Sequence, residues 1–214
     1  MLEATYIEHM GSDVSVVNAA RVSFGKKTTL TYTLPEDDKL IKYLAKHRHM
    51  SPFGHCFVSF HVKAPIFVAR QLVKHKFLRW NEISRRYVDE LPHYYSPKLR
   101  HAAKDKKQGS GEEMIITHPQ DAVITQAYAQ ADEAYKYLIQ TGVCPEQARM
   151  VLPQSVLTEW YWSGSLDAFA DMCKLRTASD TQVETRDIAQ KISYRMGKLF
   201  PVSWKALMDT IEEI

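Results

Sequence analysis

Two kinds of hydrophobic periodicity and the overall composition predict an α+β fold for this chain. Short segments in which apolar and polar residues alternate are typical of half-buried strands, and longer segments with apolar residues three or four positions apart are typical of amphipathic helices. With 45% hydrophobic and 25% charged residues, the 214-residue chain can bury a core and keep a charged surface. No repeat or linker divides it, so we expect one domain, residues 1–214.

The first elements are predicted to be a strand, a short helical segment and a longer helix. Residues 2–8 alternate in part and favour a strand, and residues 14–24 favour a helix or turn. Pro35 is followed by three acids, and bases lie at the far end of the segment, which is the charge order that a helix dipole favours. This helix should end near Met50-Ser51-Pro52, because a residue that precedes proline disfavours helical geometry.

A second strand and a helix follow. Residues 55–63 alternate, which predicts a strand with its apolar residues on one face. A helix is expected to open at Pro65 and to end in Lys74-His75-Lys76. From Trp80 onward the helical period is lost, so we expect the chain to leave the helix and fold over a ligand.

The second half of the chain is predicted to be mostly helical. Residues 98–113 are polar and contain glycines, which predicts a mobile surface excursion. Helices are predicted at 119–141, 145–151, 165–176 and 181–199, with a strand at 156–162 and a short helix after Pro201. The inward stripe of the longest helix is expected to comprise Ala127, Tyr128, Ala131, Tyr135 and Leu138.

Composition also excludes several classes of protein. No apolar run approaches the roughly 20 residues needed to span a bilayer, and no signal-peptide pattern is visible. Three cysteines without metal-ligand spacing predict a reducing, cytoplasmic setting, with Cys56, Cys144 and Cys173 in the core. His49 and His55 lie near Cys56, but their spacing fits no zinc pattern, so no metal is expected.

Positive charge is concentrated in one part of the chain. Residues 70–107 hold 11 Lys/Arg against 4 Asp/Glu, whereas the remainder carries a net charge of −4. A local surplus of this kind predicts an anionic ligand at one place rather than a protein that coats polyanions.

The segment 70–87 contains the richest set of polar groups. Lys74-His75-Lys76 precedes the run Asn81-Glu82-x-Ser84-x-Arg86-Tyr87. A basic triplet alone is most often a solvated helix end, but solubility does not explain so many different polar residues in a non-periodic segment. Ser84 lacks a Gly-x-Ser-x-Gly elbow, which argues against a nucleophile. The donors suit phosphate or carbonyl oxygens and predict a site for an anionic ligand.

This segment resembles the signature of the flavin-dependent thymidylate synthases, in which the triplet normally reads Arg-His-Arg. Other parts of the chain resemble blocks of that family, in family order, whereas residues 98–118 and 155–167 match poorly. The matching blocks are 20–24, 49–55, 60–71, 148–153 and 175–176.

The resemblance implies both a fold and a reaction. The fold would be a small central antiparallel sheet flanked by helices, assembling as a homotetramer with shared active sites. The reaction would be reductive methylation of deoxyuridine monophosphate (dUMP) to thymidylate (dTMP), with methylenetetrahydrofolate as carbon donor, FAD as cofactor and NADPH as reductant. The cofactor would carry the hard chemistry, while the protein positions the reactants and polarises the pyrimidine.

The resemblance also assigns residues. Arg176 would be catalytic, lying against the uracil, because a guanidinium that never deprotonates stabilises negative charge on the ring. Ser84, with Arg86 and Arg149, would hold the phosphate, and His49 would lie near the folate as well as the flavin. The implied nucleotide-binding residues are Gln71, Lys74, Glu82, Ser84, Arg85, Arg86, Arg149 and Arg176. The implied flavin-binding residues are His49, Ser51, Lys74, His75, Lys76, Glu82 and Asp171. We expect these side chains to line one cationic pocket once subunits assemble.

Five positions depart from the family pattern. Lys74 and Lys76 keep the positive charge but lose the planar fork of arginine. Asp171 and Asp180 stand where the family has asparagine and histidine, and Gly54 replaces an acidic residue. These differences bear on affinity for the flavin more than on the class of substrate.

Two other functions stay open from the sequence. The altered triplet motivates flavin- and folate-dependent hydroxymethylation of a deoxypyrimidine nucleotide on the same fold. The basic residues 70–107 and their aromatic neighbours motivate a non-catalytic nucleic-acid-binding protein, which would bind with steep salt dependence and carry no flavin. The enzyme hypothesis predicts a yellow preparation, with neither nucleic acid nor membrane as a partner.

Overall fold

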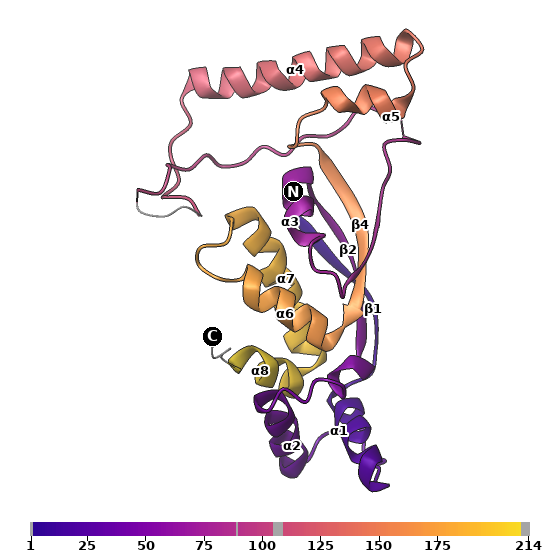
Figure 1. Ribbon diagram of the computed structural model, residues 1–214. Coiled ribbons are helices and arrows are strands. Elements are labelled where there is room, and N and C mark those ends of the chain that lie inside the picture. Colours follow the sequence, from indigo (N-terminus) through magenta and orange to yellow (C-terminus); the bar gives the residue numbers. More distant parts are fainter. Residues whose placement is uncertain (1, 89, 105–108, 211–214) are drawn as a thin grey trace.

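The computed structural model describes residues 2–88, 90–104 and 109–210. It confirms the α+β class (Figure 1). The elements in chain order are β1 (Glu3–Met10), α1 (Asp13–Arg21), α2 (Pro35–Lys46), β2 (Phe57–Pro65), α3 (Ile66–Leu72), β3 (Arg79–Glu82), α4 (His118–Gln140), α5 (Pro145–Ala148), β4 (Leu157–Ser165), α6 (Leu166–Arg176), α7 (Val183–Leu199) and α8 (Pro201–Asp209). Single 3-10 turns cover Val22–Phe24, Phe53–His55 and Arg149–Val151.

The four strands form one antiparallel sheet in the order β1-β2-β4-β3, as the resemblance implied. The two central strands pair along their whole length, from Phe57 opposite Ser165 to Pro65 opposite Leu157. Strands β2 and β4 therefore form the centre of the sheet.

Helices cover one face of this sheet rather than both. Val58, Phe60 and Val62 are fully buried, as their alternation predicted, and they belong to the same core as side chains of α6, α7 and α8. On the opposite face Tyr161 is 53% exposed. Helices α1 and α2 lie beyond one end of the sheet, and α4 and α5 lie beyond the other (Figure 1).

Strand β3 was not predicted, because long-range pairing creates it. It pairs with β4 from Arg79 opposite Ser163 to Glu82 opposite Trp160. The Trp80 ring stacks on Trp160, with ring centroids 4.2 Å apart. The residues that follow Trp80 are therefore fixed against the sheet edge instead of forming a free loop.

Two helices end earlier than predicted. Helix α3 ends at Leu72, and Pro65 is the last residue of β2, so Lys74-His75-Lys76 lies in the turn that leads into β3. Helix α2 ends at Lys46 rather than near Met50. Arg48 has a φ of 53°, and this left-handed conformation turns the chain out of the helix before the proline is reached.

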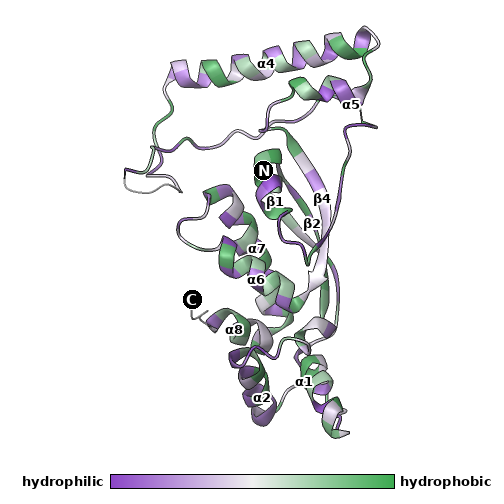
Figure 2. Ribbon diagram, in the orientation of Figure 1, coloured by the Kyte–Doolittle hydropathy of each residue, from purple (hydrophilic) through white to green (hydrophobic). Residues whose placement is uncertain are grey.

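Helices α4 and α5 form a unit that stands apart from the core; we call it the α4–α5 unit (Figure 1). Of the stripe predicted on α4, only Tyr135 is buried, whereas Ala127 is exposed and the others are half-buried. Figure 2 shows hydrophobic residues recurring along α4 although the helix lies clear of the core. Beneath it, Tyr94 stacks on Tyr128 and donates a 2.6 Å hydrogen bond to Asp132.

The described residues of the predicted excursion 98–113 are tied to the body of the molecule. The Arg100 guanidinium donates to both carboxylate oxygens of Glu184 on α7, at 2.8 and 3.0 Å, and also to the Ser110 hydroxyl at 2.7 Å. Arg100 forms an isolated β-bridge with Glu113. Residues 105–108 of this excursion lie outside the described residues.

The cysteines are only partly where they were expected. Cys56 and Cys173 are buried, as predicted, and burial raises the pKa of each thiol, that of Cys56 to about 12. Cys144 is exposed, so its assignment to the core was wrong. It precedes Pro145 at the start of α5, in the unit that stands outside the core.

The described part of the chain holds no helix suited to crossing a membrane and no cluster suited to holding a metal ion. None of the helices there is both long and apolar enough to cross a bilayer. The described residues also contain no cluster of three or more metal-ligating side chains.

Candidate active site

The predicted site residues gather at two places in the chain rather than in one pocket. Gln71, His75 and Arg176 meet where α3 and α6 end, and we call this group the α3–α6 cluster. Glu82, Arg85 and Arg149 line a cleft between the end of β3 and the residues after α5, which we call the β3–α5 cleft. One chain thus does not bring all the predicted residues into one cleft, and the cationic pocket expected on subunit assembly stays a prediction.

Arg176 is the last residue of α6 and caps the end of α3. Its Nε donates to His75 Nε2 at 3.1 Å, and one terminal nitrogen donates to the Gln71 carbonyl oxygen at 3.2 Å. Carbonyls at the end of a helix lack partners within the helix, and a cation there also interacts favourably with the helix dipole. The carboxyl end of α3 thus fixes the guanidinium.

His75 is held in its neutral form. Burial, and then the neighbouring Arg176 charge, lower the pKa of His75 from 6.5 to about 4. Because Nε2 accepts a hydrogen bond from Arg176, the ring proton belongs on Nδ1. His75 therefore acts as an acceptor that orients Arg176, and its predicted contact with a flavin stays a prediction.

The lowered pKa of His75 predicts a pH-dependent stability. As the pH falls below 6.5, the unfolded chain takes up the proton before the folded chain does, so the free energy of unfolding falls between pH 6.5 and about 4. In His75→Gln the amide oxygen can also accept a hydrogen bond from Arg176. Between pH 7.5 and pH 5 we expect the free energy of unfolding of this variant to fall by about 1 kcal/mol less than that of the parent chain, after allowance for solvent screening. Urea unfolding of both chains at the two pH values measures this difference, and equal losses would contradict the assignment.

The side chain of Gln71 is held by α7 and by the N-cap residue of that helix. Its Oε1 accepts a hydrogen bond from the Thr185 hydroxyl at 3.1 Å, and its Nε2 donates to Gln182 Oε1. Sequence reasoning missed both partners. The one available signal was a polar Thr185 on the same stripe as the buried Ile188 and Ile192.

The β3–α5 cleft has a volume of about 120 Å³ and combines charge with an apolar lining. Glu82 accepts hydrogen bonds from the Thr158 hydroxyl at 2.6 Å and from the Trp80 indole at 3.0 Å. Arg85 donates to the Glu90 carbonyl at 2.7 Å, and Arg149 donates to the Glu146 carbonyl at 3.1 Å. Thr158 lines the cleft as well, and the remaining lining residues are Ile66, Ile83, Leu152, Val156 and Leu157. Two guanidinium groups above such a surface suit an anionic ligand that also has an apolar part.

Ser84 and Arg86 lie beside this cleft without lining it. The Arg86 Nε donates to the Ser84 hydroxyl at 3.1 Å, and the Arg86 guanidinium lies 5.0 Å from the centre of the Tyr87 ring. Both arginine and tyrosine are exposed. The Ser84–Arg86 pair is preformed, and its role at a phosphate stays a prediction.

The other predicted flavin residues are exposed and spread over several elements. Lys74 and Lys76 flank His75, and Asp171 lies on the exposed side of α6. Ser51 and His49 follow α2, where the His49 ring approaches Tyr43 and His47 with centroids 6.0 and 6.4 Å apart. Their part in flavin binding stays a prediction.

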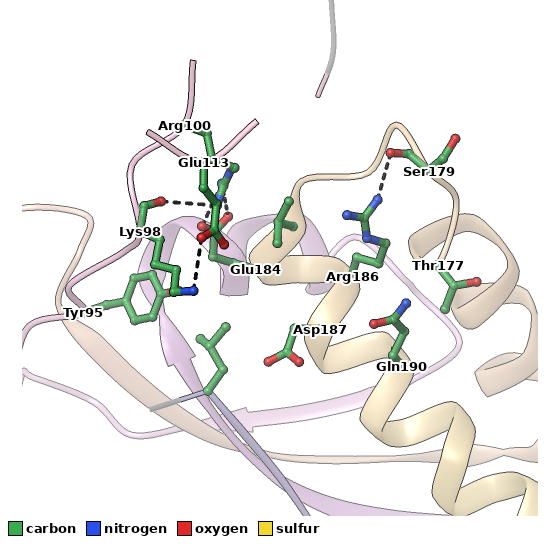
Figure 3. Close-up of a pocket in the computed structure, with 12 residues that line it drawn as sticks. Tyr95, Lys98, Arg100, Glu113, Thr177, Ser179, Glu184, Arg186, Asp187 and Gln190 are labelled. Carbon is green, nitrogen blue, oxygen red and sulfur yellow. Dashed lines mark hydrogen bonds and ion pairs between the residues drawn. The ribbon is translucent and has the colours of Figure 1, made fainter. Parts of the chain in front are cut away.

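A larger cleft, of about 740 Å³, contains none of the predicted site residues (Figure 3). It lies between α7 and the segment that carries Lys98 and Arg100. Figure 3 shows Arg100 directed at Glu184 and Lys98 directed at Glu113, so acidic neighbours neutralise these two cations. Arg186, the third cation that lines this cleft, instead donates to the Ser179 carbonyl at 2.8 Å.

Comparisons with known proteins give consistent results. A family model described as thymidylate synthase complementing protein matches residues 5–202. A flavin-dependent thymidylate synthase from Thermus thermophilus is 40% identical over 208 residues, which is 97% of this chain and 76% of the relative. One from Kosmotoga olearia is 38% identical over 206 residues, covering 95% and 88%. This chain superposes with a TM-score of 0.86 on the crystal structure of a UMP/dUMP methylase, PolB from Streptomyces cacaoi, bound with 5-Br dUMP. The two sequences are 31% identical, and the match covers 98% of this chain and 96% of the other.

Proposed function

Since this chain belongs to the thymidylate synthase complementing protein family, and its relatives are named flavin-dependent thymidylate synthases, we propose that it converts dUMP to dTMP by reductive methylation. Methylenetetrahydrofolate would supply the carbon, and NADPH would reduce a bound FAD. The name of the structural neighbour, a methylase of UMP and dUMP, supports a uracil nucleotide as the substrate.

The observation that carries this proposal is the fixed guanidinium of Arg176. Two of its five N–H donors bind the Gln71 carbonyl and His75, which leaves further donors for a ligand. Burial lowers the pKa of Arg176 from its ordinary value, but an arginine remains charged in a protein, and partial desolvation strengthens its field. A cation held in this way stabilises negative charge that develops on a pyrimidine during methylation.

The β3–α5 cleft would take the phosphate of the nucleotide. Arg85 and Arg149 supply cationic donors there, and the Ser84–Arg86 pair adds a hydroxyl and a third guanidinium at its edge. Because the cleft and the α3–α6 cluster are separate within one chain, we propose that subunits of a homotetramer combine the cleft of one chain with the cluster of another. The exposed apolar residues along α4 support assembly.

The residues present fit a flavin dinucleotide. Lys74 and Lys76 are exposed on either side of His75, where two ammonium groups could hold a pyrophosphate as point charges. Ser51, Glu82 and Asp171 would add hydrogen bonds to the flavin, and His49 would lie between the flavin and the folate. The reduced flavin would supply the electrons for methylation, whereas the protein binds, orients and polarises the pyrimidine.

A direct assay tests the proposal. Purified protein that is given FAD, NADPH, methylenetetrahydrofolate and dUMP is expected to make dTMP, and a parallel reaction tests UMP. A hydroxymethylated product would favour the alternative reaction that the altered triplet suggested. Salt-dependent binding of RNA or DNA by a preparation that takes up no flavin would favour the nucleic-acid-binding hypothesis.

We also propose a cellular compartment and a domain organisation for this chain. All three cysteines lie among the described residues and form no disulfide, which supports a reducing, cytoplasmic setting. We propose that residues 1–214 form one catalytic domain.

A further inference from the structure

Thr185 is a buried polar residue on a helix face that is otherwise built for packing. Its side chain is fully buried on α7, on the stripe that continues with Ile188, Ile192 and Met196. A valine would have almost the same shape at this position, and a buried hydroxyl is costly unless it makes a hydrogen bond. The hydroxyl of Thr185 makes such a bond, and its partner is the carboxamide of Gln71.

Gln182 holds the other end of the same carboxamide. Its Oε1 accepts a hydrogen bond from Gln71 Nε2, while Thr185 donates to Gln71 Oε1. A glutamine side chain has three rotatable bonds and is normally mobile, so two partners, one within α7 and one at its N-cap, fix its orientation before any ligand arrives. The carboxamide is thus preorganised.

The fixed carboxamide retains the groups that a uracil edge requires. A carboxamide has two N–H donors and two oxygen lone pairs, and Gln182 and Thr185 use one of each. One donor and one acceptor remain, and they complement the adjacent N–H and C=O groups of a uracil ring. The backbone carbonyl of the same Gln71 binds Arg176, so α7 also acts on the residue that anchors the guanidinium.

We propose that Thr185 and Gln182 are positioning residues for the pyrimidine, which they serve by fixing the carboxamide of Gln71 beside the guanidinium of Arg176. This inference rests on the proposed function and deepens it. It assigns a role to one residue of α7 and to its N-cap residue, which both lie outside all the sequence blocks resembling the family.

The test compares two variants of Thr185 that differ in the hydroxyl. Thr185→Val keeps the branched shape and removes the hydroxyl, whereas Thr185→Ser keeps the hydroxyl and removes a methyl group. We expect Thr185→Val to weaken dUMP binding about tenfold, as loss of one ordered hydrogen bond would, and to raise the KM for dUMP more than it lowers kcat. Thr185→Ser should recover most of the affinity, and Gln182→Met should act in the same direction as Thr185→Val.

A double-mutant cycle separates positioning from packing. In a Gln71→Met background, Thr185→Val should cause no further loss of dUMP affinity, because the carboxamide through which it acts is gone. Calorimetric binding of dUMP and the urea midpoint of each variant are the readouts. A tenfold loss that persists in the Gln71→Met background, or a Thr185→Val variant with unchanged affinity, would overturn the inference. Failure of the parent protein to bind dUMP would instead contradict the proposed function.

Discussion

Arg176→Ala is expected to lower the turnover of dUMP by at least about 100-fold, with little change in the fold. Removal of one preorganised donor that stabilises developing charge typically costs two to three orders of magnitude in kcat. Arg176 also caps α3 through the Gln71 carbonyl, so its loss should destabilise the chain by about 0.5–1 kcal/mol. The rate of dTMP formation at saturating dUMP and FAD measures the first effect, and the urea midpoint measures the second.

Arg176→Lys is the matched control for this prediction. Lysine keeps the positive charge but lacks the fork that reaches the Gln71 carbonyl and His75 Nε2 together. Its turnover should therefore lie between those of the alanine variant and the parent protein. Turnover near the parent value in Arg176→Ala would contradict the role proposed for the guanidinium.

Arg100→Ala is expected to cause a large loss of stability. The Glu184 side chain is only 3% exposed and is bound by the Arg100 guanidinium, which is itself 16% exposed. Removing the arginine leaves a buried carboxylate without compensation, which costs about 3 kcal/mol. For a chain of this size that corresponds to a fall of about 6–12 °C in Tm, which differential scanning calorimetry can measure.

Lys98→Ala is the matched control from the same segment. Lys98 pairs with Glu113, but both side chains are largely exposed, so the loss should be less than about 0.5 kcal/mol. The double variant Arg100→Met/Glu184→Gln should recover much of the stability that Arg100→Ala loses, since no unpaired charge remains buried. Equal effects of Arg100→Ala and Lys98→Ala would contradict the role given to the buried pair.

Local periodicity predicted most of the secondary structure of this chain, because helices and the central strands have strong patterns of their own. The alternation of Val58, Phe60 and Val62 identified β2 without reference to its partners. In contrast, β3 has four residues and exists because Trp80 stacks on Trp160 of β4, a contact between residues far apart in the sequence. The early end of α2 likewise depends on the backbone of Arg48, which composition does not reveal.

The candidate site, too, could be predicted from the sequence only in part. The motif residues include Gln71, His75 and Arg176, which meet in the structure although about a hundred positions separate the last from the first two. The motif does not reveal that pairing of β3 with β4 brings the Glu82 carboxylate to the Thr158 hydroxyl. Nor does it reveal Thr185, whose role follows from a hydrogen bond between helices.

The separate position of the α4–α5 unit has a consequence for how the protein loses activity on warming. Few buried apolar side chains secure this unit, so it should detach at a lower temperature than the sheet melts. Arg149, which directly follows α5, would leave its cleft in that step, while Gln71 and Arg176 stay joined. Catalysis would then cease before the protein denatures, and cooling would restore it, so heat inactivation and global melting would be distinct events.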